Sequence, residues 1–60
     1  MMPKEKLMTT DELSQYLKVP KSWVYAKTRQ GAEKRIPHLR VGKYIRFYLQ
    51  DVLDWLQHQN

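Results

Sequence analysis

Lys and Arg side chains are concentrated between Lys18 and Tyr48, where nine of them accompany a single acid, Glu33. Nine minus one gives this segment a net charge of +8, and the flanking residues bring the 60-residue chain to +5. Each basic side chain that neutralises a phosphate releases condensed counterions, so charge concentrated in one segment favours a polyanionic partner. The alternative is a basic surface that only aids solubility, because net charge by itself does not specify a partner.

The residue types needed for catalysis or metal binding are scarce. The chain has no Cys, and neither His38 nor His58 has a Ser, Asp or Cys at a spacing that favours nucleophilic catalysis. Asp51 and Asp54 could share one helix face, but two carboxylates make a weak metal site, and helix capping with solubility explains them better. We therefore expect neither an enzyme nor a bound metal or cofactor.

The length of 60 residues limits the chain to one domain, for which we expect residues 7–57, with residues 1–6 and 58–60 as flexible ends. A chain this short buries only about 60% of its unfolded surface, so its aromatic side chains must supply much of the core. No apolar run approaches the ~18 residues of a membrane span, and residues 1–6 lack the apolar stretch of a signal peptide. We expect a cytoplasmic protein with no membrane partner.

Two short helices with a tight turn between them are predicted for the first half of the chain. Residues 9–12 (TTDE) form a capping box, with Thr9 as the N-cap, which predicts that the first helix begins there. This helix ends by Pro20, because the residue before a proline avoids the α region, and Pro20 suits the first position of the next helix. The predicted buried side of the first helix carries Leu13, Tyr16 and Leu17.

The second helix is predicted over residues 21–30, with Gly31 as the left-handed residue just past its end. Val24 is the inward anchor of this helix, and a rotation of about 100° per residue places Thr28 beside it. The opposite side then carries Ser22, Ala26 and Arg29. Two helices joined by so tight a turn form a helix-turn-helix.

Residues 38–47 alternate between polar and apolar side chains around Gly42 and Lys43, which predicts a β-hairpin. A two-residue loop at positions 42 and 43 would suit a type II′ turn and would set Val41 opposite Tyr44. A three-residue loop would instead align Val41 with Ile45. We favour the longer loop, because register follows the buried face and this loop gives one face with Leu39, Val41, Ile45 and Phe47.

The last segment predicts a third helix, because four apolar side chains recur at i, i+3, i+4 and i+7, with Trp55 at the edge of their stripe. These side chains are Leu49, Val52, Leu53 and Leu56. The predicted fold is therefore mainly α-helical with a small β-hairpin. It is a winged helix-turn-helix, in which the hairpin is the wing and the third helix closes the core.

Four sequence fragments, in this order and spacing, are similar to those of the excisionase-type helix-turn-helix family, small MerR-like winged helices of phages and mobile elements. The fragments are residues 9–13 (TTDEL), 19–25 (VPKSWVY), 40–47 (RVGKYIRF) and 51–56 (DVLDWL). The resemblance covers about residues 7–57. It implies double-stranded DNA binding in a bacterial or phage-infected cell, with the second helix in the major groove and the hairpin as a wing.

Proteins of this family either bend attachment-site DNA to direct an integrase towards excision or act as small transcriptional regulators. The resemblance implies DNA-binding residues on the recognition helix, at Lys21, Ser22, Tyr25, Ala26, Lys27 and Arg29. It implies others on the wing, at Arg40, Lys43, Tyr44 and Arg46. Many relatives have a basic residue where this chain has Ala26, so we expect base reading to shift to Ser22, Tyr25 and Arg29.

Each of these assignments has a plainer alternative. Arg29 is the best candidate for a bidentate contact with guanine, but it could instead be a solvated cation near a helix end. The wing cations are placed to follow a phosphate backbone, but they could instead be edge-strand charges that prevent aggregation. For the aromatic residues between the basic ones, packing in the core and at its rim is favoured over stacking on single-stranded bases.

A module of this length buries a limited area on DNA. Useful affinity therefore requires copies that associate cooperatively on adjacent sites, or a protein partner such as an integrase or recombinase. A rival interpretation is a protein-interaction module, in which the third helix and the Trp55 edge bind a recombinase or polymerase subunit without DNA contact. The salt dependence of DNA affinity separates the two interpretations, because only phosphate contacts release counterions.

Overall fold

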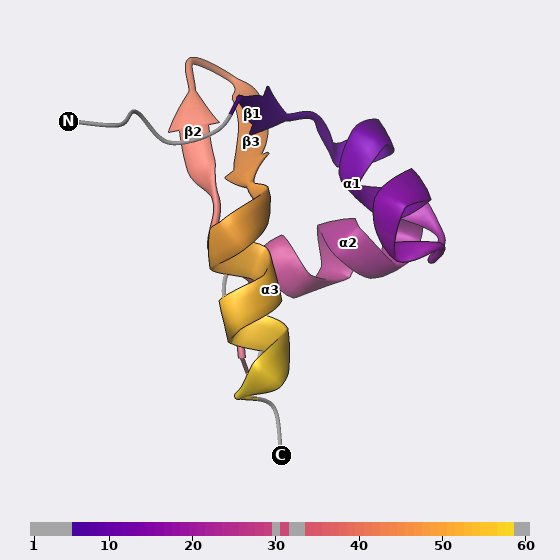
Figure 1. Ribbon diagram of the computed structural model, residues 1–60. Helices are drawn as coiled ribbons and strands as arrows, with labels where there is room; N and C mark the ends of the chain where they lie inside the picture. Colours follow the sequence, from indigo (N-terminus) through magenta and orange to yellow (C-terminus); the bar gives the residue numbers. More distant parts are fainter. Residues whose placement is uncertain (1–5, 30, 32–33, 59–60) are drawn as a thin grey trace, which may run out of the picture.

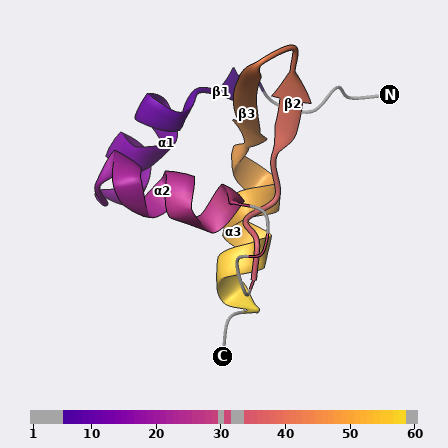
Figure 2. The same cartoon turned by 180° about the vertical axis from the view of Figure 1, so that it is seen from behind.

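Three helices and a small antiparallel sheet make up the part of the chain that the computed structural model describes, residues 6–29, 31 and 34–58. The sheet and α3 form a column, and α1 and α2 pack against one side of it (Figures 1 and 2). The predicted winged helix-turn-helix is confirmed, with the β2–β3 hairpin as the wing. In chain order the elements are β1 (Leu7–Met8), α1 (Thr10–Leu17), α2 (Lys21–Thr28), β2 (Leu39–Val41), β3 (Tyr44–Tyr48) and α3 (Leu49–Gln57).

The predicted capping box opens α1. The Thr9 hydroxyl accepts a hydrogen bond from the backbone N–H of Glu12 at 3.1 Å, and the Glu12 carboxylate accepts one from the Thr9 N–H at 2.9 Å. At the other end Lys18 adopts a left-handed conformation (φ 61°, ψ 46°), and the Val19 N–H donates to the Ser14 carbonyl at 3.0 Å. This Schellman-type closure, usually built on Gly, turns the chain sharply towards α2.

Replacing Lys18 by Gly is expected to stabilise the domain. A side chain in the left-handed conformation costs about 1–2 kcal/mol, which Gly avoids, although the greater freedom of Gly in the unfolded chain offsets part of the gain. We expect the free energy of unfolding to rise by about 0.5–1 kcal/mol, a Tm increase of roughly 2–8 °C in thermal denaturation. Lys18→Ala removes the same charge but keeps a Cβ, so a Gly variant no more stable than this control would contradict the prediction.

The second helix is shorter than the predicted 21–30, because it ends at Thr28. Arg29 leaves the helix in an extended conformation (φ −66°, ψ 139°), and the Lys27 carbonyl accepts a hydrogen bond from the Ile36 N–H at 3.0 Å. The Ile36 N–H thus bonds to a carbonyl that would accept from the next turn if the helix continued. Pro20, predicted to take the first position of this helix, is instead its N-cap, and Lys21 is the first helical residue.

β3 is the central strand of the sheet, in the order β1-β3-β2. β1 sets Leu7 opposite Tyr48 and adds a third strand that the alternation of residues did not predict. In the wing, Val41 lies opposite Tyr44, so the two-residue loop is correct and the favoured three-residue loop is wrong. Gly42 has a φ of 63°, the positive value that a type II′ turn requires at its first loop position.

The register prediction failed because β2 buries none of its three residues. Leu39 and Val41 lie on the outer face of the sheet, so they do not join the core as the favoured register required. The core instead takes the alternate side chains of β3, with Phe47 fully buried and Ile45 packed beside it. An edge strand without a buried face leaves the turn chemistry to decide the register.

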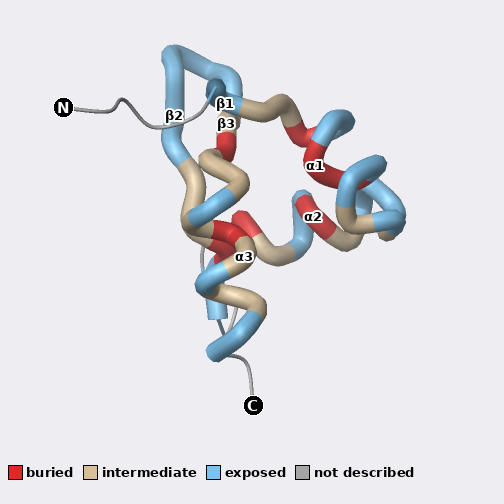
Figure 3. Tube along the Cα trace, viewed as in Figure 1, coloured by how far each residue is buried: buried red, intermediate tan, exposed pale blue. Residues whose placement is uncertain are grey.

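The core lies where α1, α2, α3 and the inner face of the sheet meet (Figure 3). Its fully buried members are Leu13, Val24, Ile36, Phe47 and Val52. Tyr16, predicted to be buried, is 55% exposed, and α1 turns Thr10 and Ser14 inward instead. In α3, Trp55 packs against the core, whereas Leu53 is half-buried outside the core cluster. Three short helices and a small sheet therefore share one small core.

Candidate nucleic-acid interface

α2 presents one side to solvent and the other to the core, as the sequence predicts. Val24 and Thr28 are buried and fix the rotation of the helix. The Thr28 hydroxyl also donates to the backbone carbonyl of Tyr25 at 2.8 Å. The predicted recognition residues that α2 leaves exposed are Lys21, Ser22, Tyr25 and Ala26. None of them is acidic, so this side of α2 places no negative side chain of its own against a phosphate backbone.

The C-terminal end of α2 is held by Arg35, a residue that sequence analysis did not single out. One guanidinium nitrogen of Arg35 donates to the Thr28 carbonyl at 2.9 Å and lies 3.3 Å from His38 Nε2. His38 Nδ1 donates in turn to the Ile36 carbonyl at 2.8 Å, which leaves Nε2 as an acceptor for Arg35. Arg35 therefore satisfies a carbonyl that the helix end leaves open and ties the connector before the wing to α2.

The basic residues of α2 differ in how freely they can reach a ligand. The Lys21 ammonium lies 3.7 Å from the Asp11 carboxylate, but both side chains are more than half exposed, so this ion pair contributes little to stability. The Lys27 ammonium stands over the Trp23 ring, 5.5 Å from its centroid, and Lys27 is half-buried. Arg29 is exposed just beyond the helix. Lys21 and Arg29 are therefore the accessible cations, at opposite ends of α2.

Two of the predicted wing cations, Lys43 and Arg46, lie over the ring of a third predicted wing residue, Tyr44. The Lys43 ammonium lies 5.9 Å, and the Arg46 guanidinium 5.3 Å, from the centroid of the Tyr44 ring. Arg46 also donates to the Ile45 carbonyl at 2.9 Å. These contacts hold two cations near the wing tip before any ligand arrives, which reduces the entropy lost on binding. Arg40 lies opposite Ile45, so it is on the other face of the sheet from Tyr44 and Arg46.

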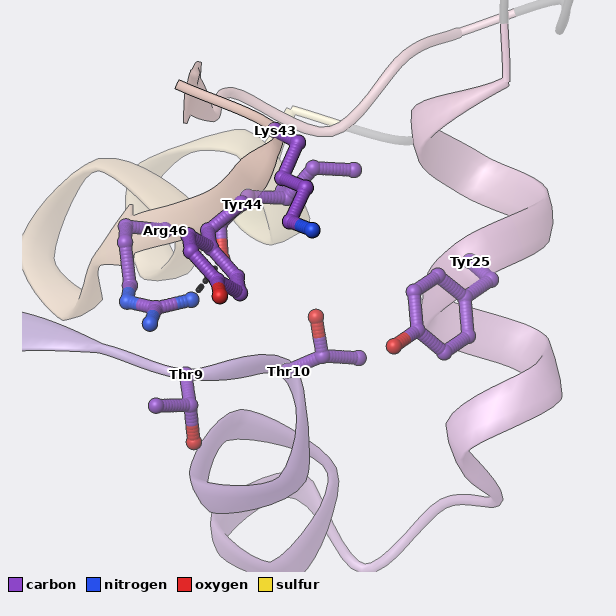
Figure 4. Close-up of a pocket in the computed structure, with 7 residues that line it drawn as sticks. Thr9, Thr10, Tyr25, Lys43, Tyr44 and Arg46 are labelled. Carbon is purple, nitrogen blue, oxygen red and sulfur yellow. Dashed lines mark hydrogen bonds between the residues drawn. The ribbon is translucent and has the colours of Figure 1, made fainter. Parts of the chain in front are cut away.

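A cavity of about 200 Å³ lies between the wing, the start of α1 and α2. In Figure 4, Lys43 reaches over it from the wing, Tyr25 faces it from α2, and the Thr10 hydroxyl points into it from α1. Thr9, Tyr44 and Arg46 complete its polar lining, and no acidic side chain contributes to it. The cavity joins the exposed side of α2 to the wing tip. From the sequence, these two surfaces were predicted separately, and Thr9 was predicted only as a helix cap.

The structure therefore divides the predicted DNA-binding residues into three groups. Around the cavity lie Tyr25, Lys43, Tyr44 and Arg46. On or just beyond the exposed side of α2 lie Lys21, Ser22, Ala26 and Arg29. Outside both groups lie Lys27 and Arg40.

Within the described residues, 6–29, 31 and 34–58, there is no cluster of three or more His, Cys, Asp or Glu side chains that could hold a metal ion. No helix in this part of the chain combines the length and the apolar character needed to cross a membrane.

Comparison with known protein families shows that residues 7–60 match the family described as "Helix-turn-helix domain". Comparisons with curated proteins and with solved structures give no significant match. The family match covers nearly the whole chain and includes the α1–α2 turn, the wing and α3. Sequence and structure agree on this point, and the chain belongs to the helix-turn-helix domain family.

Proposed function

We propose that this domain binds double-stranded DNA, with α2 in the major groove and the wing against the neighbouring backbone. The observation that supports this best is the shared cavity, because Tyr25 from α2 and Lys43 from the wing face the same space (Figure 4). One ligand could therefore contact α2 and the wing at the same time. The major groove of B-DNA, about 12 Å wide, admits an α-helix. The family includes small DNA-binding proteins of the excisionase type.

Within DNA binding, we propose a preference for sequence and a role as an excisionase or a small transcriptional regulator. Ser22 and Ala26 are small and exposed on α2, so the helix backbone can approach base edges closely. Tyr25 and Arg29 supply the longer polar side chains.

An excisionase would bend attachment-site DNA and contact an integrase or recombinase. Direct repeats in the site would indicate head-to-tail copies, and an inverted repeat would indicate a two-fold dimer.

DNA binding is tested by titrating labelled duplexes with the protein at several salt concentrations. The logarithm of the affinity should fall linearly with the logarithm of the salt concentration, with a slope of about −0.9 for each phosphate neutralised. An affinity for duplexes that is absent, or that salt does not change, would contradict the proposal.

Replacing Lys43 by Ala is expected to weaken binding to all duplexes alike. The Lys43 side chain is exposed at the wing tip, where a cation contacts phosphates more readily than base edges. The salt slope should become shallower by about one unit. Lys34→Ala is the matched control, because it removes the same charge from an exposed position outside α2 and the wing, and it should leave the slope nearly unchanged. If Lys43→Ala also kept the wild-type slope, the proposed phosphate contact would be excluded.

A protein-interaction module is the second candidate, and an exposed, partly apolar face of the sheet favours it, on which Arg46 lies opposite Leu39. Leu39, Val41 and Tyr44 are 41%, 50% and 54% exposed and lie together on the outer face of the sheet. The α3 edge that the sequence suggested for this role carries Trp55, which is half-buried and packs edge-on against Trp23, with 6.4 Å between the ring centroids. The salt titration separates the two candidates, since a module that binds only protein has no salt-dependent affinity for duplexes.

A further inference from the structure

The Thr10 hydroxyl is the least expected polar group in the cavity between α1, α2 and the wing. Thr10 is only 6% exposed, and its hydroxyl has no hydrogen-bond partner among the described residues. Figure 4 shows this hydroxyl pointing into the cavity. The hydroxyl itself is not a buried atom without a partner, so it keeps contact with solvent through the cavity. It is therefore free to donate a hydrogen bond to a ligand in the cavity.

Two further donors face the same space from other elements. The Tyr25 hydroxyl comes from α2, and the Lys43 ammonium comes from the wing (Figure 4). The two acids in the first turn of α1 are engaged elsewhere, since Asp11 pairs with a lysine of α2 and Glu12 accepts from the helix-cap N–H at 2.9 Å. The two hydroxyls and the ammonium can each donate a hydrogen bond to an oxygen of a phosphate group, and no acid in the lining would repel it.

The size of the cavity also suits a phosphate group. Its volume of about 200 Å³ is several times the roughly 30 Å³ that one water molecule occupies in the liquid. We propose that this cavity binds one phosphate group of the DNA backbone through Thr10, Tyr25 and Lys43. The inference rests on the proposed DNA binding and deepens it, because it names the subsite that connects α2 to the wing.

A phosphate in this cavity would fix both the rotation and the depth of α2 in the major groove, since its three ligands come from three elements. Two of the ligands are neutral, so their loss removes a hydrogen bond without changing the number of counterions released. Thr10→Val and Tyr25→Phe should therefore each weaken duplex binding by about tenfold at an unchanged salt slope. Lys43→Ala, in contrast, should change the slope.

The contact is tested with duplexes that carry one neutral methylphosphonate at a time, scanned along both strands of a sequence that the protein binds. The wild-type protein should lose about tenfold or more in affinity at the position of the bound phosphate. With the methylphosphonate at that position, Thr10→Val and Tyr25→Phe should bind only slightly more weakly than the wild-type protein binds the same duplex. The reason is that the neutral group is already a poorer hydrogen-bond acceptor for the hydroxyl that the variant lacks. Such non-additivity between a change in the protein and a change in the DNA identifies a direct contact.

Tyr16→Phe is the matched control, because Tyr16 is 55% exposed, close to the 51% of Tyr25, but lies outside the cavity. It should bind every duplex as the wild type does. Thermal unfolding checks the fold of Thr10→Val, and Tyr25→Phe carries the test alone if that variant does not fold. Additive losses at every backbone position would overturn the phosphate site while leaving DNA binding intact. A wild-type protein that binds no duplex would overturn both proposals.

Discussion

Replacing Phe47 by Ala is expected to unfold the domain. Phe47 is the largest of the fully buried side chains and lies in the central strand, opposite Met8 of β1. Truncating a buried Phe to Ala costs about 3–5 kcal/mol, because the loss of transfer free energy is followed by a cavity that neighbours fill only in part. A domain of this length has a total stability of about 3–9 kcal/mol, so most of it would be lost. Circular dichroism during thermal denaturation would show a flattened or absent unfolding transition.

Tyr44→Ala is the matched control for Phe47→Ala. Both are aromatic residues of β3, but Tyr44 is 54% exposed and is not part of the core cluster. Its loss should lower the free energy of unfolding by about 1 kcal/mol or less, as is usual for surface substitutions. A Phe47→Ala variant that melted within a few degrees of Tyr44→Ala would contradict the assignment of the core.

Replacing Ala26 by Glu is expected to abolish specific DNA binding while the domain stays folded. Ala26 is exposed in the middle of α2, and Glu is a good helix former, so the substitution should cost little stability. If α2 enters the major groove, the new carboxylate meets phosphates and base acceptors, and a like-charge contact at an interface costs several kcal/mol. We expect duplex affinity to fall by about 100-fold or more, equivalent to roughly 2.7 kcal/mol, in a fluorescence titration.

Gln57→Glu controls for the change in net charge, because it adds the same carboxylate at an exposed position in the last turn of α3. This variant should lose only a few-fold in affinity through the long-range field, and added salt should reduce that loss further. Equal losses in Ala26→Glu and Gln57→Glu would mean that α2 is not the element in contact with DNA.

Local signals in the sequence were enough to predict the helices and the fold class. The capping box at Thr9 depends on residues only three positions apart, and the buried pair Val24 and Thr28 follows from helical spacing. Each signal involves neighbours within about one helical turn, so the rest of the fold does not need to be known. The alternation around Gly42 indicated the wing for the same reason.

Features that depend on distant contacts could not be predicted in this way. α2 stops at Thr28 because Arg35 and Ile36 bond to its last carbonyls, and these residues follow a connector whose path the sequence does not reveal. β1 forms only because Leu7 and Met8 reach the end of β3. The favoured wing register assumed that β2 has a buried face, and whether an edge strand buries a face depends on the packing of the whole domain.

The candidate site was predictable as two surfaces but not as one cavity. Charge and spacing indicated the exposed side of α2 and the wing tip, since those residues lie in continuous segments. Thr10 gave no signal, because a Thr beside a capping box is explained by the helix start alone. Its juxtaposition with Tyr25 and Lys43 arises only when three elements pack together.

We propose that the exposed side of α2 reads DNA sequence. Selection of bound duplexes from a random library at about 150 mM salt tests it most directly, because this salt concentration suppresses purely electrostatic binding. We expect the wild-type protein to enrich a short motif and the Ala26→Glu variant to enrich none, while Gln57→Glu enriches the same motif as the wild type. A wild-type protein that enriched no motif, or an Ala26→Glu variant that enriched the same one, would contradict the claim.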